Sequence, residues 1–365
     1  MSKLKVLIVD DSVVYRSQIK TMLEKVDWIE VVGTAANGSI ALQKVQQMEV
    51  DLVTLDIEMP ELDGLGFLKE AQKLNKNFKT IVFSSQNKTQ AGMTITALEL
   101  GASDFVAKPS GASTSLEEAL AQVEKELLPK IQQFRGSRVV SSTSTAKASS
   151  AATVGSKPTE KRNFVKVNLD TIRPKVIVIA SSTGGPRALE TVFSGVKGPL
   201  SVPVLIVQHM PPVFTKSLAE RLTSISQVTV EEAKHGDNFQ AGKILLAPGD
   251  YHMRVKSPNT VSLDQAPKRN SVRPAADFLF ETAIEHFGQS VLGIVLTGMG
   301  NDGCDGAVAI KEKCGGVFIQ DKASCVVWGM PQAVYAKEAY DGMGTLQDCS
   351  SLLNQFQAIT RLKVG

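Results

Sequence analysis

Residues 176–186 read Val-Ile-Val-Ile-Ala-Ser-Ser-Thr-Gly-Gly-Pro, a stretch that combines an apolar run, a glycine turn and a proline. The apolar, largely β-branched run is typical of a parallel strand buried on both faces. Pro186 suits the first turn of a helix, so Ser181 and Ser182 are expected at a strand-to-helix corner. In open α/β sheets the reactive crevice lies at this carboxyl edge, where free N–H groups can hold an oxyanion. We therefore expect a nucleophilic serine here, and Ser182 is the candidate.

Length and composition bound the remaining possibilities. The 365 residues suffice for two domains, each with its own core. A net charge of +3 with 21% charged residues gives no basic stripe, so we expect neither nucleic-acid binding nor membrane insertion. The cysteines form no C-x-x-C pair, and the chain starts without a signal-peptide pattern, which predicts reduced thiols and a cytoplasmic location.

Residues 1–133 predict the first domain, because apolar strands alternate there with amphipathic helical segments. Strands are expected near 4–9, 29–35, 50–55, 79–84 and 104–107. Helices are expected near 13–26, 38–48, 64–74, 88–100 and 115–133. Successive βα units of this kind predict a doubly wound parallel sheet.

Residues 134–170 are dominated by Ser, Thr and Ala and predict a flexible linker. A second, mostly parallel α/β domain is expected over 171–365. Its strands are expected near 175–180, 202–207, 243–247, 292–296 and 316–319, and its helices near 187–195, 214–223, 274–287, 303–313 and 331–338. A β-hairpin is expected around 250–265, with its turn at Pro258 and Asn259.

Polar residues follow several strands of the first domain at the same edge of the sheet. Asp10 and Asp11 end the first strand, Asp56 the third, Ser84 the fourth and Lys108 the fifth. Each alone would fit a helix cap or a solvated turn, but their joint placement favours a site. Mg²⁺ prefers carboxylate oxygens, and an aspartate between the cation and a lysine can accept a phosphoryl group. The Ser84 hydroxyl could bond that group.

The first domain resembles the response-regulator receiver family over residues 1–125. The motifs that carry the resemblance are Val9-Asp10-Asp11-Ser12, Asp56-x-x-Met59-Pro60 with Asp63-Gly64, Ser84, Gly101-Ala102 and Lys108-Pro109. The resemblance implies a flavodoxin-like fold and Asp56 as phosphoacceptor. It also implies Mg²⁺ held by Asp11 and Asp56 with help from Asp10, and a switch formed by Ser84, Lys108 and the aromatic Phe105.

In the second domain, an attacking serine needs a base and a carboxylate that orients it. The chain has four histidines. His209 follows the strand at 202–207 and is the first candidate for the base, whereas His252 also borders a strand and is the alternative. His235 lies in a charged loop and His286 within a helix, which are weaker positions.

Asp302 is the candidate for the orienting acid. It is the carboxylate of the glycine-rich turn Thr297-Gly298-Met299-Gly300-Asn301-Asp302-Gly303, which follows the strand at 292–296. It could also cap the next helix, and the two roles are compatible. Neither a G-x-G-x-x-G motif nor a Walker lysine accompanies these glycines, so we expect no cofactor in this domain.

The whole chain outside the linker resembles the bacterial chemotaxis protein-glutamate methylesterase/glutaminase family, known as the CheB family. The shared motifs are Ser182-Thr183-Gly184-Gly185, Gln208-His209-Met210-Pro211, Ala247-Pro248-Gly249-Asp250, the turn at 297–303, and Ala323-Ser324-Cys325-Val326-Val327-x-Gly329-Met330-Pro331. The resemblance implies Ser182 as nucleophile rather than Ser181, His209 as base and Asp302 as orienter. Some relatives carry a histidine before the Arg-Pro pair, where this chain has Val272.

The resemblance also implies the reaction and the partners. The expected enzyme is a phosphorylation-regulated serine hydrolase that demethylates glutamyl methyl esters and deamidates glutamines on methyl-accepting chemotaxis receptors, with a chemotaxis histidine kinase as phosphodonor. Two alternatives remain at this stage. A receiver joined to a DNA-binding output lacks support, because the second domain shows no helix-turn-helix pattern or basic face. A receiver-regulated serine esterase with another substrate stays open.

Overall fold

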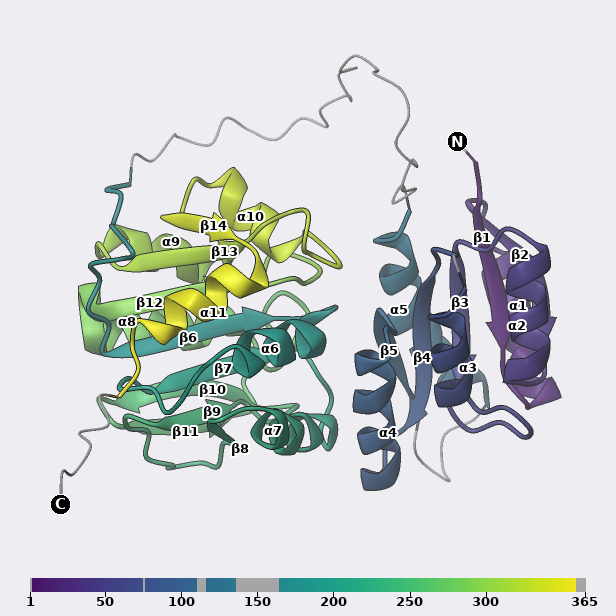
Figure 1. Cartoon of the computed structure of the whole chain (residues 1–365), viewed down its shortest axis with the longest axis horizontal. Helices are drawn as coiled ribbons and strands as arrows, with labels where there is room; N and C mark the ends of the chain where they lie inside the picture. Colours follow the sequence, from purple (N-terminus) through teal and green to yellow (C-terminus); the bar gives the residue numbers. More distant parts are fainter. Residues whose placement is uncertain (1, 75, 110–115, 136–163, 359–365) are drawn as a thin grey trace, which may run out of the picture.

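The computed structural model describes residues 2–74, 76–109, 116–135 and 164–358 and contains two α/β domains (Figure 1). The first has a parallel sheet in the order β2-β1-β3-β4-β5. Its strands are β1 (Leu4–Val9), β2 (Ile29–Ala35), β3 (Leu52–Asp56), β4 (Lys79–Ser85) and β5 (Asp104–Lys108). Its helices are α1 (Val13–Glu24), α2 (Gly38–Gln47), α3 (Gly64–Ala71), α4 (Lys88–Glu99) and α5 (Leu116–Gln132). This order confirms the flavodoxin-like prediction.

The second domain contains a seven-stranded parallel sheet in the order β14-β13-β12-β6-β7-β9-β8. The strands are β6 (Val176–Ser181), β7 (Val204–Gln208), β8 (Thr229–Glu232), β9 (Lys243–Leu246), β12 (Val291–Val295), β13 (Gly316–Gln320) and β14 (Gly342–Gly344). The helices are α6 (Gly185–Ser194), α7 (Phe214–Ile225), α8 (Ala276–Phe287), α9 (Cys304–Glu312), α10 (Met330–Ala336) and α11 (Leu346–Asn354), with a short 3₁₀ turn η1 (Gly288–Ser290).

A separate antiparallel hairpin confirms the expectation at 250–265. It consists of β10 (His252–Ser257) and β11 (Thr260–Asp264). The predicted linker falls mainly on residues 136–163, which lie outside the described residues, so the domain boundaries stay a prediction. Of the same predicted stretch, residues 164–170 pack against the second domain through Phe164, Val167 and Leu169.

The central strands explain where each site lies. Strands β6, β7 and β12 are buried throughout, because helices cover both faces of the sheet. The chain crosses from β6 to β7 on one side, whereas β12 lies on the other side, so β6 is the point at which the strand order reverses. Strand β1 has the same place in the first sheet, between β2 and β3. Crevices at the carboxyl ends of such strands are the usual ligand sites of this fold class.

Contacts also join the two domains. One cluster of buried side chains runs from the first domain into the second, and Phe105 of β5 packs on Phe214 of α7 with ring centroids 4.6 Å apart. Helix α4 lies against α7 and α6 (Figure 1).

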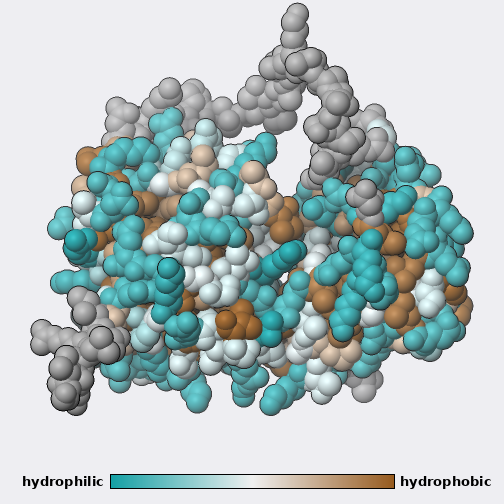
Figure 2. All heavy atoms as spheres, in the orientation of Figure 1, coloured by the Kyte–Doolittle hydropathy of each residue, from teal (hydrophilic) through white to brown (hydrophobic). Residues whose placement is uncertain are grey.

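The face of the molecule in Figure 2 carries mostly hydrophilic side chains, with hydrophobic ones in small groups. Within the described residues, no helix is long and apolar enough to cross a membrane.

A buried ion pair fastens the start of the second domain. Lys311 of α9 donates to Asp341 over 2.6 Å, and both side chains are fully buried. Lys311 also donates to the carbonyl of Val165, while Asp341 accepts from the backbone N–H groups of Val167 and Val317. The hydrogen bonds to both side chains compensate for the cost of removing the two charges from water. They also tie residues 165–167 to the edge of the sheet.

This pair generates the first prediction. Asp341→Ala leaves the Lys311 ammonium buried without its counter-charge, which should lower the free energy of unfolding of the second domain by about 3–5 kcal/mol. Urea titration followed by Trp328 fluorescence in a Trp28→Phe background measures this domain, because these are the two tryptophans of the chain. Glu231→Ala, which removes an exposed pair with Lys243 in the same domain, should change its stability by less than about 1 kcal/mol. Equal effects of the two substitutions would contradict the assignment.

Candidate active site and phosphorylation site

The carboxylates of the first domain gather at the carboxyl ends of β1 and β3. Ligand oxygens of Asp10, Asp11 and Asp56 all lie within 4.8 Å of one another. Strand register explains this, because Val9 pairs with Leu55 and so the residues that follow them become neighbours. Lys108, at the end of β5, places its ammonium 2.7 Å from Asp56 and 3.6 Å from Asp10.

One ammonium does not neutralise this cluster. Burial raises the pKa of Asp10 and Asp56 above the usual aspartate value, Lys108 opposes the shift, and the neighbouring carboxylates add to it. The Oδ2 atom of Asp10 is buried without a hydrogen-bond donor. A buried carboxylate oxygen with no donor, beside two further carboxylates, fits a hard divalent cation such as Mg²⁺.

Ser84 lies at this edge, whereas Phe105 lies near the start of β5. Ser84 is buried near the end of β4, one residue beyond the partner of Asp56, and accepts a hydrogen bond from Thr94. Phe105 is buried against Phe214 of the second domain. The structure therefore places the aromatic residue of the predicted switch in the domain interface, a contact that strand patterns cannot predict.

In the second domain, strand register brings the predicted triad residues to one place. Ser181 pairs with Gln208 across β6 and β7, so the residues that follow them, Ser182 and His209, are neighbours at the carboxyl edge. Ser181 is fully buried and donates to the side chain of Gln208, whereas Ser182 is partly exposed. Of the two serines, Ser182 is therefore the one with a hydroxyl open to a substrate.

The turn at 297–303 closes the site from the β12 side. Ser182 donates its backbone N–H to Thr297, and a Cβ atom on Gly298 would lie 2.8 Å from the Cβ of Ser182. Only a glycine at 298 allows so close an approach. At the start of α6, Gly184 has a φ of 75°, which suits the tight corner between β6 and the helix.

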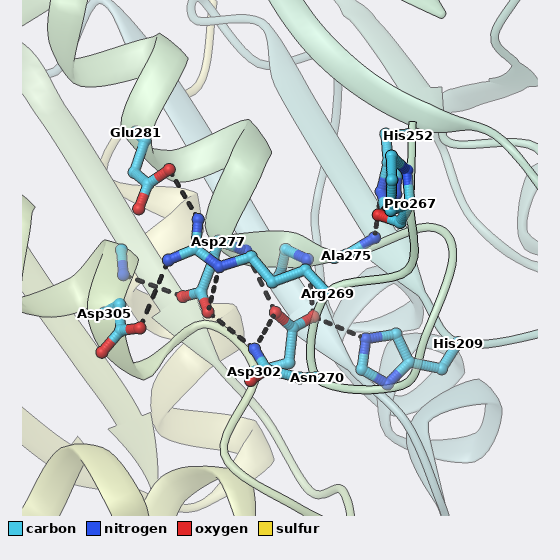
Figure 3. Close-up of polar contacts among 12 residues, drawn as sticks. His209, His252, Pro267, Arg269, Asn270, Ala275, Asp277, Glu281, Asp302 and Asp305 are labelled. Carbon is cyan, nitrogen blue, oxygen red and sulfur yellow. Dashed lines mark hydrogen bonds and ion pairs between the residues drawn. The ribbon is translucent and has the colours of Figure 1, made fainter. Parts of the chain in front are cut away.

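His209 and Asp302 form the central polar contact of this site (Figure 3). The Nε2 atom of His209 lies 2.7 Å from Asp302 Oδ2. Asp302 is 2% exposed and also accepts from the backbone N–H groups of Ala276 and Asp277 and from the amide of Asn270. Burial opposes the charge, but these hydrogen bonds and the neighbouring imidazole lower the pKa of Asp302 to about 2.

The bond to Asp302 also sets the roles of the ring nitrogens. An ionised carboxylate only accepts, so Nε2 of His209 carries the hydrogen and Nδ1 holds the free lone pair. In the described part of the chain no hydrogen bond joins the Ser182 hydroxyl to His209. The structure thus joins two of the three predicted triad residues directly and places the third on the adjacent strand end.

His252, the alternative base, is a fully buried link between β10 and the loop before α8. Its Nδ1 atom accepts from the N–H of Ala275, and Nε2 lies 3.2 Å from the carbonyl of Pro267. Burial lowers its pKa. Both nitrogens are engaged with the backbone, so this geometry favours His209 as the base.

The other two histidines, His235 and His286, are exposed. Val272 lies in a turn that is closed by the hydrogen bond from its N–H to the carbonyl of Arg269.

Contacts that the motifs did not reveal connect the two domains. Thr183, next to the candidate nucleophile, donates its hydroxyl to Asp104 of β5 over 2.5 Å. Arg221 of α7 lies 2.6 Å from Glu99 of α4 and 3.3 Å from Glu190 of α6. The first domain therefore contacts the residue beside Ser182. Such cross-domain partners leave no periodic signal in the sequence.

Comparison with known proteins gives matches to both domains. A family model described as CheB methylesterase matches residues 177–353, and one described as response regulator receiver domain matches residues 6–121. A protein-glutamate methylesterase/protein-glutamine glutaminase of Trichodesmium erythraeum is 44% identical over 92% of this chain and 93% of its own. One of Nocardioides is 42% identical over 92% and 90%. The crystal structure of the Thermotoga maritima CheB methylesterase catalytic domain aligns at 40% identity and a TM-score of 0.48, over 50% of this chain and 99% of that one.

The acidic pair at the interface generates a pH prediction. Burial, and then the charge of Glu99, raise the pKa of Glu190 to about 7, although Arg221 opposes the shift. A raised folded-state pKa contributes stability that is complete below the ordinary value of about 4.5 and is lost as pH rises through 7. Glu190→Gln should remove this loss of stability. Its free energy of unfolding, relative to that of the unsubstituted chain, should therefore rise by on the order of 1–2 kcal/mol between pH 5 and 8.

Urea titration at several pH values measures the difference between the two proteins. Glu231→Gln is the control, because Glu231 lies on the outer strand β8 in an exposed pair with Lys243. Parallel pH profiles for the Glu190→Gln and unsubstituted chains would contradict the prediction.

Proposed function

Because the chain belongs to the family of protein-glutamate methylesterases/protein-glutamine glutaminases and is an enzyme of that class, we propose that Ser182 is its nucleophile, with His209 as base and Asp302 as orienting acid. The observation that carries the proposal is the buried 2.7 Å contact between His209 and Asp302 at the strand end next to Ser182. The proposed substrate is a glutamyl methyl ester on a methyl-accepting chemotaxis receptor.

The reaction follows from the arrangement of these groups. Ser182 Oγ attacks the ester carbonyl while its proton passes to Nδ1 of His209, and Asp302 stabilises the imidazolium through Nε2. The carbon–oxygen bond to the methoxy group then breaks, and His209 returns the proton so that methanol leaves. Water repeats the sequence on the acyl-enzyme and yields glutamate and free Ser182. Glutamine follows the same route with ammonia as the leaving group.

The oxyanion of each tetrahedral intermediate needs backbone donors. Gly185 and Gly298 already donate their N–H groups, to Ser182 and Val327. Within the described residues, the N–H groups of Thr183 and Gly184 and those of the turn at Met299 and Gly300 make no such bond. These groups are the proposed oxyanion donors, because they flank Ser182 from both sides.

The first domain is the proposed regulator of this hydrolase. Asp56 is the proposed phosphoacceptor, with a chemotaxis histidine kinase as donor, Asp10, Asp11 and Asp56 as Mg²⁺ ligands, and Ser84, Lys108 and Phe105 as the switch. Mg²⁺ would supply charge neutralisation for the incoming phosphoryl group. The contacts of Asp104 with Thr183 and of Phe105 with Phe214 support a docked state that restrains the catalytic edge. The proposed location is the cytoplasm.

Substitution of the two adjacent serines tests the nucleophile. Ser182→Ala should lower methanol release from methylated receptor membranes by at least about a thousandfold. Ser181→Ala removes a buried hydrogen bond to Gln208 but no attacking group, so much of the activity should remain. The reverse outcome would move the nucleophile to Ser181. If the enzyme hydrolyses a small ester but releases no methanol from methylated receptor membranes, the same site has another substrate.

Regulation is tested on the full chain with a small-molecule phosphodonor and Mg²⁺. Methanol release should rise, by a factor bounded by the coupling between the domains at roughly 5- to 150-fold, and Asp56→Ala should remove the response. Arg221→Glu removes the cation that bridges Glu99 and Glu190 and leaves only carboxylates at this contact, so it should raise activity without a phosphodonor. Lys20→Glu on α1, which breaks an exposed pair with Glu24, is the matched charge-reversal control. Unchanged basal activity in Arg221→Glu would contradict a restraining interface.

A further inference from the structure

A second buried carboxylate lies beside the proposed catalytic acid. Asp277 of α8 is fully buried and Asp302 is 2% exposed. The side-chain amide of Asn270 stands between them and donates over 2.9 Å to Asp277 Oδ2 and over 3.1 Å to Asp302 Oδ1 (Figure 3). Both hydrogens of one amide nitrogen are thus used on two carboxylates.

The orientation of this amide follows from its partners. Carboxylate oxygens accept hydrogen bonds, so the nitrogen of Asn270 must face them, because its own oxygen would repel both. Asn270 itself lies at the surface and has a φ of 52°, a conformation that asparagine tolerates better than most residues. Because Asn270 is exposed, its inward-pointing amide does not fill the hydrophobic core; it serves the two carboxylates.

The surrounding charges show why a donor is needed between the carboxylates. Arg269 lies 3.5 Å from Asp277 and also binds Glu281 and Asp305, so its charge is shared among three acids. Asp277 has one further donor, the N–H of Gly306. Burial, and then the charge of Asp302, raise the pKa of Asp277 to about 7.

Asp302 divides its hydrogen bonds between its two oxygens. Oδ2 receives His209 and the N–H of Ala276, while Oδ1 receives Asn270 and a longer bond from the N–H of Asp277. The rotation of the carboxylate is therefore fixed by donors on both oxygens. Without Asn270, Oδ1 would keep only the 3.2 Å backbone bond.

We propose that Asn270 is a positioning residue for the reaction: its amide holds the Asp302 carboxylate toward His209 and separates it from Asp277. This inference rests on the proposed role of Asp302. The amide touches neither the substrate nor the reacting atoms, so its effect reaches the reaction through Asp302 and His209.

The test begins with Asn270→Ala in the full chain. The kcat for methanol release should fall on the order of 10- to 100-fold, as expected for a lost hydrogen bond to a charged group, while KM stays nearly constant. The acid limb of kcat/KM should move to higher pH. Both carboxylates lose a donor that favours their charged form, so the pair retains a proton to higher pH and the fraction of enzyme with an ionised Asp302 falls there.

A double substitution distinguishes positioning from general disruption. In Asp277→Asn the new amide oxygen can still accept from the N–H of Gly306. Its nitrogen then replaces the oxygen that accepted from Asn270, so two donors face each other. Asp277→Asn alone should therefore be slow. Asn270→Ala with Asp277→Asn removes that conflict and one buried charge, and should be faster than Asn270→Ala alone, with the acid limb restored.

Two controls separate the possible failures. Ser271→Ala changes the next residue, which also has a positive φ and bonds neither carboxylate, and should leave kcat and thermal stability unchanged. Asp302→Asn measures the proposed catalytic acid itself. If Asp302→Asn is inactive while Asn270→Ala keeps the normal kcat and pH profile, the inference about Asn270 is wrong and the proposed triad stands. If Asp302→Asn is fully active, the triad itself is wrong.

Discussion

The ionised carboxylate of Asp302 at the start of α8 is the constraint around which the second domain is arranged. Helix α8 begins at Ala276 without a side-chain cap from Ala275. Asp302, far along the chain, accepts the first two helical N–H groups instead, and His252 accepts the N–H of Ala275. An anion at a helix N-terminus is stabilised by the free donors and by the helix dipole. The same hydrogen bonds that cap the start of α8 therefore favour the charged form of Asp302 beside His209.

The turn that carries Asp302 also connects the proposed catalytic edge to the first domain. Thr297 donates its hydroxyl to the carbonyl of Thr183 and accepts from the N–H of Val327. Val326 and Val327 in turn pack against the core of the first domain. The first domain thus contacts both the residue after Ser182 and the loop that supports the opposite wall. Movement of this domain would change access to Ser182 and the support of the turn together.

The sequence predicted the central strands and the strand-end residues well, because buried parallel strands and glycine turns have strong local patterns. The strands β8 and β14 and the helix α11 were missed. Strand β8 is a partly exposed edge with two glutamates, and β14 has only three residues. Helix α11 carries a capping box at Thr345 and Asp348, which was a readable signal. Asn270, Asp277 and Asp104 act through contacts between distant segments, and no spacing in one sequence reveals those.

The pKa values of the strand-end carboxylates shift in opposite directions in the two domains, being raised for Asp10 and Asp56 and lowered for Asp302. At the ends of β1 and β3, Asp10 and Asp56 are buried with one lysine between them, and burial raises the pKa of both. Such a cluster is short of positive charge, so a cation or a bound phosphoryl–metal group can complete it. Asp302 receives four hydrogen bonds and has no need of a cation. Parallel sheets bring acids to the strand ends in both domains, and the number of donors decides whether those acids suit a bound cation, as proposed for Asp10 and Asp56, or stay charged without one, as the proposed role of Asp302 requires.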